Sequence, residues 1–296
     1  MHLDKIFIQP ITDSLFTKNN IELDILRLDV IHKTVSGNKS FKLKYYLEDA
    51  KQKGYRGIVT YGGAYSNHII ASAYACKEYG FKSSGIIRGE EPKTFSHTLL
   101  HAKALGMELH FVDRQNFRNK NILKVWGNDF YEIPEGGFGI LGAKGCSEIL
   151  LCINNLSQYH HIICATGTGT MLAGIVQAAL PQQHCTGISV MKNNFSLHNE
   201  VLSLLPDDFG NKNFTILHEY HFGGYAKYNN ELLSFINESW HRHTLPLDFV
   251  YTAKTFFAVQ KLAEKKYFSN GCKILMIHSG GLQGNLSLPA GILSFL

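Results

Sequence analysis

The sequence predicts an α/β protein built on open, mostly parallel sheets. Short apolar runs typical of strands alternate with segments of helical periodicity along nearly all of the 296 residues. Several of these runs end in a glycine-rich segment that leads into the next helix. Parallel strands need crossover helices between them, so this alternation favours a parallel sheet. The run Glu-Gly-Gly-Phe-Gly over 135–139 interrupts the alternation, and we place a domain crossing near it.

The expected elements of the first half are short and are bounded by turn residues. Residues 21–28 alternate partly between apolar and polar side chains, as a half-buried strand does. Gly106 follows an apolar helical stripe, in the position of a helix C-cap. Strands are expected at 21–28, 57–61, 84–87 and 109–112, and helices at 39–53, 67–80 and 99–105, whereas residues 116–129 are ambiguous.

The second half continues the same alternation. Apolar runs of four or five residues predict buried strands, and longer stretches with apolar residues three and four apart predict helices. Strands are expected at 161–165, 187–190, 214–217 and 274–277, and helices at 146–156, 170–180, 197–204, 230–240 and 253–268.

Composition and charge are those of an ordinary globular protein. Hydrophobic residues make up 45% of the chain and charged residues 18%. No apolar run is long enough to cross a bilayer, and the first residues lack the apolar core of a signal peptide. We therefore expect no membrane partner and a cytoplasmic location. The net charge of +5 is spread along the chain rather than concentrated, so we expect no nucleic-acid partner.

Cysteines and histidines do not form recognisable metal motifs. The six cysteines contain no CxxC pair, and most lie in apolar runs, so we expect buried free thiols rather than disulfides or zinc ligands. The fifteen histidines also lack metal-ligand spacing. We expect no metal site.

Lys39 lies where a polar turn runs into a helix. Ser36, Gly37 and Asn38 favour the turn, because each is a poor residue for a helix interior. Apolar residues from Leu43 onward recur at spacings of three and four, which places Lys39 in the first helical turn. A solvated lysine is the simplest interpretation of a lone lysine there. Two further stretches make Lys39 a candidate catalytic residue.

The first stretch is Thr-Gly-Thr-Gly-Thr over 166–170, which follows a strand and opens a helix. Glycines let the backbone approach an anion, and a helix N-terminus offers free N–H donors and a positive dipole. Residues Gly167, Thr168, Gly169 and Thr170 therefore form a candidate phosphate cradle. The run is neither GxGxxG nor a P-loop, which disfavours a nucleotide. A tight turn that merely needs glycine is the alternative.

The second stretch, residues 62–68, also joins a strand to a helix. Its backbone amides could hold a carboxylate. Ser66 adds a hydroxyl and Asn67 a polar amide, although either could simply be the helix N-cap. A lysine together with a phosphate site is what pyridoxal phosphate (PLP) requires, because the lysine forms a Schiff base with the aldehyde and the cradle holds the phosphate.

Five motifs in matching order resemble those of the D-cysteine desulfhydrase and 1-aminocyclopropane-1-carboxylate (ACC) deaminase family, PLP enzymes of the tryptophan synthase β type. The motifs lie at 36–43, 62–68, 133–137, 250–254 and 277–282. The resemblance implies two open, mostly parallel α/β domains (PLP fold type II) with the site in the cleft between them. The large domain would comprise 1–47 and 136–296, with a small domain at 48–135 inserted in it. The resemblance to this family also suggests that the protein is a homodimer.

The resemblance implies a role for each matching residue. Lys39 would carry PLP and later move the substrate α-proton, Ser66 could take part in proton transfer, and Tyr251 would lie against the ring. The implied catalytic residues are Lys39, Ser66 and Tyr251. The implied cofactor-binding residues are Lys39, Asn67, Gly167, Thr168, Gly169, Thr170, Thr252 and Ser279. The implied substrate-binding residues are Ser66, Asn67, His68 and Tyr225.

Thr252 and Ser279 separate the two activities of the family. They would face the PLP ring nitrogen, where the ACC deaminases that this chain resembles carry Glu and Leu. Neutral hydroxyls leave the ring nitrogen largely unprotonated, which suffices to expel a good β leaving group such as thiolate. We therefore expect α,β-elimination from a small amino acid, D-cysteine above all, giving pyruvate, ammonia and sulfide. ACC deaminase activity, and binding of PLP or an amino acid without catalysis, are the alternatives.

Overall fold

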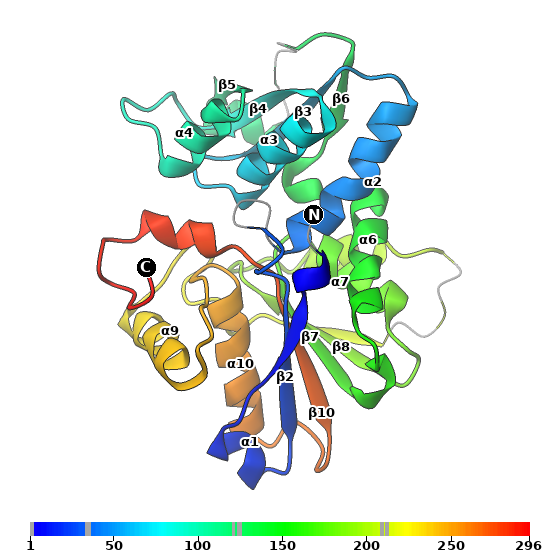
Figure 1. Ribbon diagram of the computed structural model, residues 1–296, viewed down its shortest axis with the longest axis vertical. Helices are drawn as coiled ribbons and strands as arrows, with labels where there is room; N and C mark the ends of the chain where they lie inside the picture. The colour runs from blue at the N-terminus through cyan, green and yellow to red at the C-terminus, as the bar shows by residue number, and fades with distance from the viewer. Residues whose placement is uncertain (1–2, 33–36, 120–121, 123–125, 208–209, 211–212) are drawn as a thin grey trace.

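The computed structural model describes residues 3–32, 37–119, 122, 126–207, 210 and 213–296, and these form two sheets (Figure 1). The larger sheet contains six strands in the described part of the chain. Its strands, in spatial order, are β1 (Phe7–Pro10), β2 (Glu22–Arg27), β10 (Lys273–His278), β7 (His161–Thr166), β8 (His184–Ser189) and β9 (Phe214–Leu217). All neighbours pair in parallel except β1, which is antiparallel to β2.

The smaller sheet is entirely parallel among the described residues. Its strands, in spatial order, are β5 (Met107–Val112), β4 (Lys82–Arg88), β3 (Gly57–Gly63) and β6 (Phe130–Ile133). It forms the upper part of the molecule in Figure 1, above the larger sheet. The predicted α/β class with mostly parallel sheets is therefore confirmed.

Helices cover the sheets because alternate strand residues point to opposite faces. In β10, Ile274 and Met276 enter one apolar cluster, whereas Leu275 and Ile277 enter another. The α-helices are α1 (Ser14–Lys18), α2 (Asn38–Gln52), α3 (Asn67–Tyr79), α4 (His97–Ala104), α5 (Arg114–Arg118), α6 (Ile140–Ser147), α7 (Thr170–Ala178), α8 (Leu197–Leu202), α9 (Asn230–His243) and α10 (Thr252–Glu264). Single 3-10 turns lie at Leu3–Lys5, Glu135–Gly137, Glu148–Cys152, Leu156–Gln158 and Leu282–Ser287.

Several elements depart from the sequence prediction. The strands β1 and β6 and the helix α1 were not predicted, because four- and five-residue elements carry too little periodicity to be recognised. The ambiguous segment 116–129 lies beside the short helix α5. The helix predicted at 146–156 is wrong.

The prediction missed the true position of α6, Ile140–Ser147, because this helix contains glycines that are needed for close packing. An added Cβ at Gly145 would come within 1.9 Å of the Phe41 carbonyl oxygen, and one at Gly142 within 2.2 Å of the Gly137 oxygen. Glycine is a poor helix former, so its presence hides a helix from pattern reading. After Ser147 the chain continues only as a 3-10 turn, Glu148–Cys152.

The helix α2 connects the two sheets (Figure 1). Phe41 packs in a cluster of the larger sheet, whereas Leu43, Leu47 and Ala50 pack against the smaller sheet. The strands of the smaller sheet lie between Gly57 and Ile133. The domain limits 1–47 with 136–296, and 48–135, stay a prediction.

Three stretches with candidate site residues follow strands: the residues after Gly63 follow β3, Gly167 to Thr170 follow β7, and Ser279 follows β10. Tyr251 and Thr252 do not follow a strand and lie at the start of α10. The Asp248 carboxylate accepts backbone N–H groups from Val250, Tyr251 and Thr252, which caps the helix instead of extending a strand.

The described residues include no helix that is long and apolar enough to cross a membrane. All six cysteines are unpaired, and five of them are buried, as the sequence predicts.

Candidate active site

Lys39 lies in the first turn of α2, on a backbone that only glycine permits. Gly37 precedes the helix with φ +68°, and an added Cβ would come within 1.7 Å of the Ser279 carbonyl oxygen. The N–H of Asn38 donates to that oxygen at 3.1 Å, which ties the helix start to the segment after β10. Residue 36 of the predicted turn lies outside the described residues.

The amine of Lys39 is not a solvated surface group. Its Nζ donates to Asn38 Oδ1 at 2.9 Å and lies 6.0 Å from the centre of the Tyr251 ring. Burial and the nearby Lys42 charge lower the pKa of Lys39 to about 7. A neutral amine is therefore well populated near neutral pH, as a nucleophile that attacks an aldehyde requires.

The predicted phosphate cradle follows β7. Gly169 adopts φ +79° and caps α7, which begins at Thr170. The hydroxyls of Thr168 and Thr170 lie 3.0 Å apart. Thr170 is fully buried, and an added Cβ at Gly167 would lie 3.7 Å from the Tyr251 ring. Two hydroxyls and the first amides of a nine-residue helix therefore converge beside Tyr251.

Lys42 is a cradle residue that the sequence reasoning missed. Its Nζ lies 3.1 Å from the Gly136 carbonyl oxygen and 3.4 Å from Thr168 Oγ1. The side chain is buried, burial lowers its pKa, and within the described chain it forms no ion pair. One feature of the sequence could have indicated this role of Lys42. It lies three residues after Lys39, and this spacing puts both side chains on one face of α2.

The segment after β3 leads into the start of α3. Ser66 is the N-cap of this helix, and its Oγ accepts the N–H groups of His68 at 3.2 Å and Ile69 at 3.3 Å. The simpler sequence interpretation of Ser66 as a cap is therefore confirmed. Asn67 Oδ1 accepts a hydrogen bond from Gln283 Nε2, which the sequence did not predict.

His68 is buried and neutral. Its Nε2 pairs with Thr60 Oγ1 at 2.8 Å, whereas its Nδ1 is buried without a hydrogen-bond partner. Burial, with the charges of Lys39 and Lys42, holds the pKa of His68 well below its usual range. An unpartnered ring nitrogen close to two lysines fits a site that is completed by a bound polar group.

Thr252 and Ser279 are both buried. The Thr252 hydroxyl donates to Asp248 Oδ1 at 2.7 Å and accepts the Asp248 N–H at 2.8 Å. Asp248 receives three backbone N–H groups as well, so its carboxylate is saturated with donors. The sequence analysis did not predict that the Asp248 carboxylate lies beside Thr252 or that it accepts a hydrogen bond from the Thr252 hydroxyl.

Tyr251 and Tyr225 meet at their hydroxyls. Tyr251 donates to Tyr225 Oη at 3.4 Å, with the rings inclined at 72°. Burial, then Tyr225, keeps the pKa of Tyr251 well above its usual range, so its phenol stays protonated. The two rings follow Lys39 by 186 and 212 residues in the sequence, and the fold brings them to its side of the molecule.

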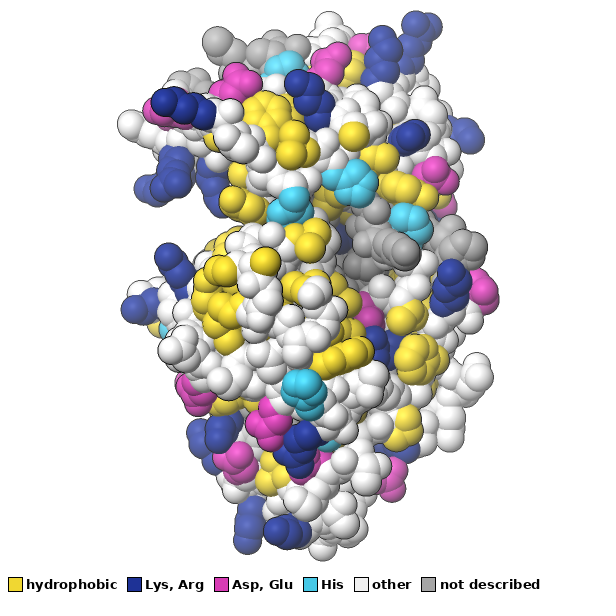
Figure 2. All heavy atoms as spheres, turned by 60° about the vertical axis from the view of Figure 1, so that its left-hand side comes forward, with side chains coloured by type: hydrophobic (Ala, Val, Ile, Leu, Met, Phe, Trp, Pro, Cys, Tyr) yellow, Lys and Arg dark blue, Asp and Glu magenta, His cyan; other side chains and the backbone are white. Residues whose placement is uncertain are grey.

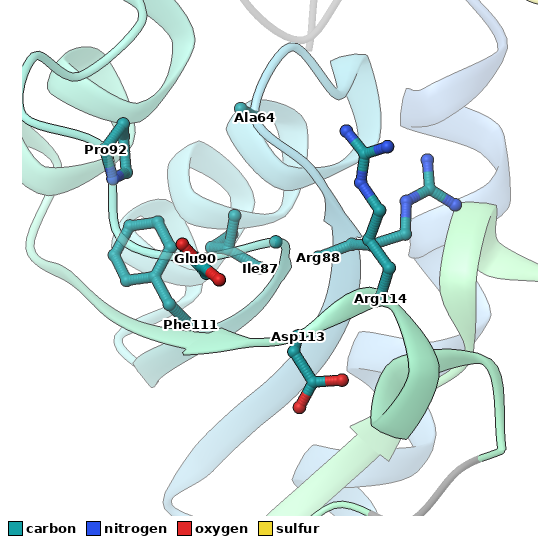
Figure 3. Close-up of a pocket in the computed structure, with 9 residues that line it drawn as sticks. Ala64, Ile87, Arg88, Glu90, Pro92, Phe111, Asp113 and Arg114 are labelled. Atoms are coloured by element: carbon teal, nitrogen blue, oxygen red, sulfur yellow. The ribbon is translucent and has the colours of Figure 1, made fainter.

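Charged side chains occupy the outer part of the site. Arg88 at the end of β4 lies 3.9 Å from Glu135, and both are about half exposed. Figure 2 shows an indentation between the upper and lower parts of the molecule. A hollow of about 480 Å³ adjoins the segment after β3 at Ala64. Arg88 and Arg114 lie on one side of this hollow, and Glu90, Pro92 and Phe111 on the other (Figure 3).

These residues fit PLP. Lys42, two threonine hydroxyls and a helix N-terminus surround a place that suits a phosphate dianion, and a neutral lysine amine lies in the same helix turn for the aldehyde. The fold and the site thus define a class of enzymes that hold PLP by its aldehyde and its phosphate. Their α/β fold contains two mostly parallel sheets.

The comparisons with known proteins agree with this class. The chain belongs to the family of pyridoxal-phosphate dependent enzymes, whose family model matches residues 13–280. It is 31% identical, over 91% of its length and 92% of the relative's, to a Thermotoga maritima protein that carries the provisional name 1-aminocyclopropane-1-carboxylate deaminase. It is 25% identical to the D-cysteine desulfhydrase of Yersinia enterocolitica, over 88% of this chain and 86% of that one.

A solved structure gives the same result for the fold. The crystal structure of an ACC deaminase homologue superposes with a TM-score of 0.80 at 25% identity, covering 98% of this chain and 94% of the other. The predicted family, cofactor and PLP fold type II are therefore confirmed. The chain is a PLP-dependent lyase of the ACC deaminase and D-cysteine desulfhydrase type.

Proposed function

We propose that this lyase catalyses α,β-elimination from D-cysteine, giving pyruvate, ammonia and sulfide. One observation carries the choice: the residues expected at the ring nitrogen, Thr252 and Ser279, are neutral. The nearby carboxylate of Asp248 is saturated by four hydrogen bonds and is not free to hold a proton on the ring. A neutral surrounding suits the loss of a thiolate, which is a good leaving group.

Each side chain of the site has a task in this reaction. Lys39 would hold the cofactor by its aldehyde, and its amine would move the proton at the substrate α-carbon, with Ser66 as the second candidate for that transfer. PLP, when bound, supplies the electron sink for the α-carbon. Lys42, Thr168 and Thr170 hold its phosphate with the amides of Gly167 and Gly169.

The remaining residues orient cofactor and substrate. Asn67 would hydrogen-bond the ring hydroxyl, and Gln283 donates a hydrogen bond that orients the Asn67 amide. Ser66, Asn67 and His68 hold the substrate carboxylate at the start of α3. Tyr251 lies against the ring, and Tyr225 borders the substrate. A homodimer in the cytoplasm, without nucleic acid, remains our expectation for the assembly.

A side-by-side assay tests the proposal. We expect purified protein with PLP to show an absorption band above about 400 nm, and to release pyruvate and sulfide from D-cysteine faster than pyruvate from D-serine or L-serine. Ammonia release from ACC is expected to be slow. A protein that gains no such band with added PLP, or that acts on ACC alone, contradicts the proposal.

ACC deaminase is the second candidate, because a relative with 31% identity carries that name. The bifunctional D-cysteine desulfhydrase and ACC deaminase of Arabidopsis thaliana, 26% identical over 90% of this chain, has both activities in its name. The ratio of the two rates therefore decides between the candidates, rather than the presence of one activity.

A further inference from the structure

The segment that carries Tyr225 has an unusual backbone. Phe222, Gly223, Gly224 and Ala226 all have positive φ, at 50°, 89°, 119° and 53°. Two of these residues have side chains, for which this region is unfavourable. Such a backbone persists only when its surroundings hold it.

Lys254 in α10 supplies a contact that holds this segment. Its side chain is fully buried, and its Nζ donates to the carbonyl oxygens of His221 at 2.9 Å and Gly224 at 2.7 Å. Within the described residues Lys254 forms no ion pair, and its Nζ donates its hydrogen bonds to these two backbone oxygens. These bonds, together with the charge of the nearby Asp248 carboxylate, favour the ammonium against the unfavourable effect of burial.

The carbonyl groups of His221 and Gly224 also accept the backbone hydrogen bonds that form the turns of residues 221–227. The His221 oxygen also accepts the Gly224 N–H at 3.0 Å, and the Gly224 oxygen accepts the Lys227 N–H at 3.2 Å. The ammonium thus bridges consecutive turns of residues 221–227. Tyr225, the residue next to Gly224, points its hydroxyl to Tyr251.

Lys254 is also fixed in relation to the site. It lies two residues after Thr252 and three after Tyr251, in the first turn of α10. The spacing of three residues therefore directs the Tyr251 hydroxyl and the Lys254 ammonium to the same segment, residues 221–225. The distance between Tyr251 and Tyr225 depends on the contact between α10 and the segment 221–225.

We propose that Lys254 is a positioning residue, an internal ammonium clamp that fixes residues 221–225 and thereby places Tyr225 over Tyr251 on the substrate side. The effect on turnover rests on the proposed function, whereas the effect on the segment does not. The clamp acts through the two carbonyls and has no contact with substrate.

The test uses Lys254→Ala in the full-length protein with added n-propylammonium, which restores the three carbons and the ammonium that the substitution removes. In Lys254→Ala without cofactor we expect amide hydrogen exchange at Gly224 and Lys227 to rise about tenfold to a hundredfold, because hydrogen bonds to a charged group contribute on that scale. Amides of β7 and β10 are expected to keep their protection. n-Propylammonium is expected to restore the slow exchange, whereas tetramethylammonium, which has no N–H, is not.

Turnover gives a second readout with bound PLP. We expect kcat/KM for D-cysteine to fall about tenfold in Lys254→Ala and to recover with n-propylammonium, while the absorption band of the cofactor is unchanged. Lys261→Ala is the matched control, since Lys261 lies in the same helix but is partly exposed and pairs with Glu264. It is expected to behave like the unsubstituted protein in both readouts.

Two results would overturn the clamp: unchanged exchange at Gly224 and Lys227 in Lys254→Ala, or fast exchange that n-propylammonium does not reverse. A variant that is less stable throughout is still informative, because the rescue is measured on those two amides. If the protein has no activity on D-cysteine but the exchange results hold, the proposed function fails and the clamp stands.

Discussion

The cofactor side and the substrate side of the site are built differently. The proposed cofactor side, which comprises Lys39, Lys42 and residues 167–170, consists of two lysine amines, hydroxyls and backbone amides at the starts of two helices. The substrate side, which comprises residues 66–68, Tyr225 and Tyr251, depends on contacts between segments far apart in the chain. Under the proposed roles, the first side would bind a phosphate and an aldehyde, which never change, and the second would select a substrate.

Under the proposed roles, the specificity of the enzyme would reside on the substrate side. On the cofactor side, local geometry is nearly sufficient: glycine fixes each helix start, and the helix supplies the donors. On the proposed substrate side, Asn67 accepts a hydrogen bond from Gln283, and Tyr225 follows Gly224, whose carbonyl oxygen accepts one from Lys254. A change at Lys254 is expected to alter the substrate side and leave the cofactor side intact.

The largest expected effect comes from removing the amine on the cofactor side. Lys39→Ala is expected to lower kcat for D-cysteine by about 10³-fold to 10⁴-fold, because the variant lacks both the covalent attachment and the proton-transferring group. Pyruvate formation measures it, with circular dichroism to show an intact fold. Full turnover in this variant would remove the basis of the proposed mechanism.

A smaller effect is expected from the second lysine of the same helix. Lys42→Met removes a buried ammonium beside Thr168 and is expected to weaken PLP binding about tenfold to a hundredfold, because the lost bond is charge-assisted. Titration of the apoprotein with PLP measures the change. Lys44→Met is the control, since Lys44 is partly exposed and pairs with Glu148. Equal affinities in the two variants would show that Lys42 is not a phosphate ligand.

The pH dependence of amine capture probes the same side of the site. Because the pKa of Lys39 is lowered to about 7, its neutral form grows as the pH rises through that value. Capture of pyridoxal, which lacks a phosphate, is expected to rise about tenfold between pH 6 and pH 8 and then to level off. Borohydride trapping followed by mass spectrometry at Lys39 measures it.

An ordinary lysine would behave differently in that experiment, since its reactivity would keep rising beyond pH 9. The substitution Lys42→Met removes the neighbouring positive charge and is therefore expected to raise the pKa of Lys39 and to move the midpoint upward. A midpoint that moves downward would mean that the Lys42 charge does not act on Lys39.

The smallest effect is expected from a contact that joins the two sides. Gln283→Ala removes the donor to Asn67 and is expected to weaken PLP binding about threefold to fivefold, as for a neutral hydrogen bond. A double-mutant cycle with Asn67→Ala measures the coupling. Effects that simply add would show that Gln283 does not act through Asn67.

Much of the fold was predictable because its signals are local. The apolar runs of β3, β7 and β10 and the glycines after them identify these strands and the position of Thr168, whereas the polar turn before α2 identifies the position of Lys39. The cofactor side follows from these positions, since a helix start after a parallel strand presents its amides in a fixed direction. The family motifs added the residue roles, which remain proposals for this chain.

Other parts could not be predicted from the pattern. The helix α6 was misplaced because Gly142 and Gly145 are selected by contact with distant backbone rather than by helix propensity. Lys42 looked like any surface lysine until its burial was known. Asp248 and Lys254 likewise carry no local signal of their hydrogen bonds to Thr252 and to the segment 221–224.

The sequence by itself determined the alternation of strands and helices, the lysine at a helix start and the glycine-threonine cradle, because each depends on the conformational preferences of neighbouring residues. The tertiary structure alone decided the lowered pKa of Lys39, the second lysine in the cradle and the partners of Asn67, Thr252 and Tyr225. Burial and charge proximity are properties of packed segments, and packing brings together residues that the chain order keeps apart.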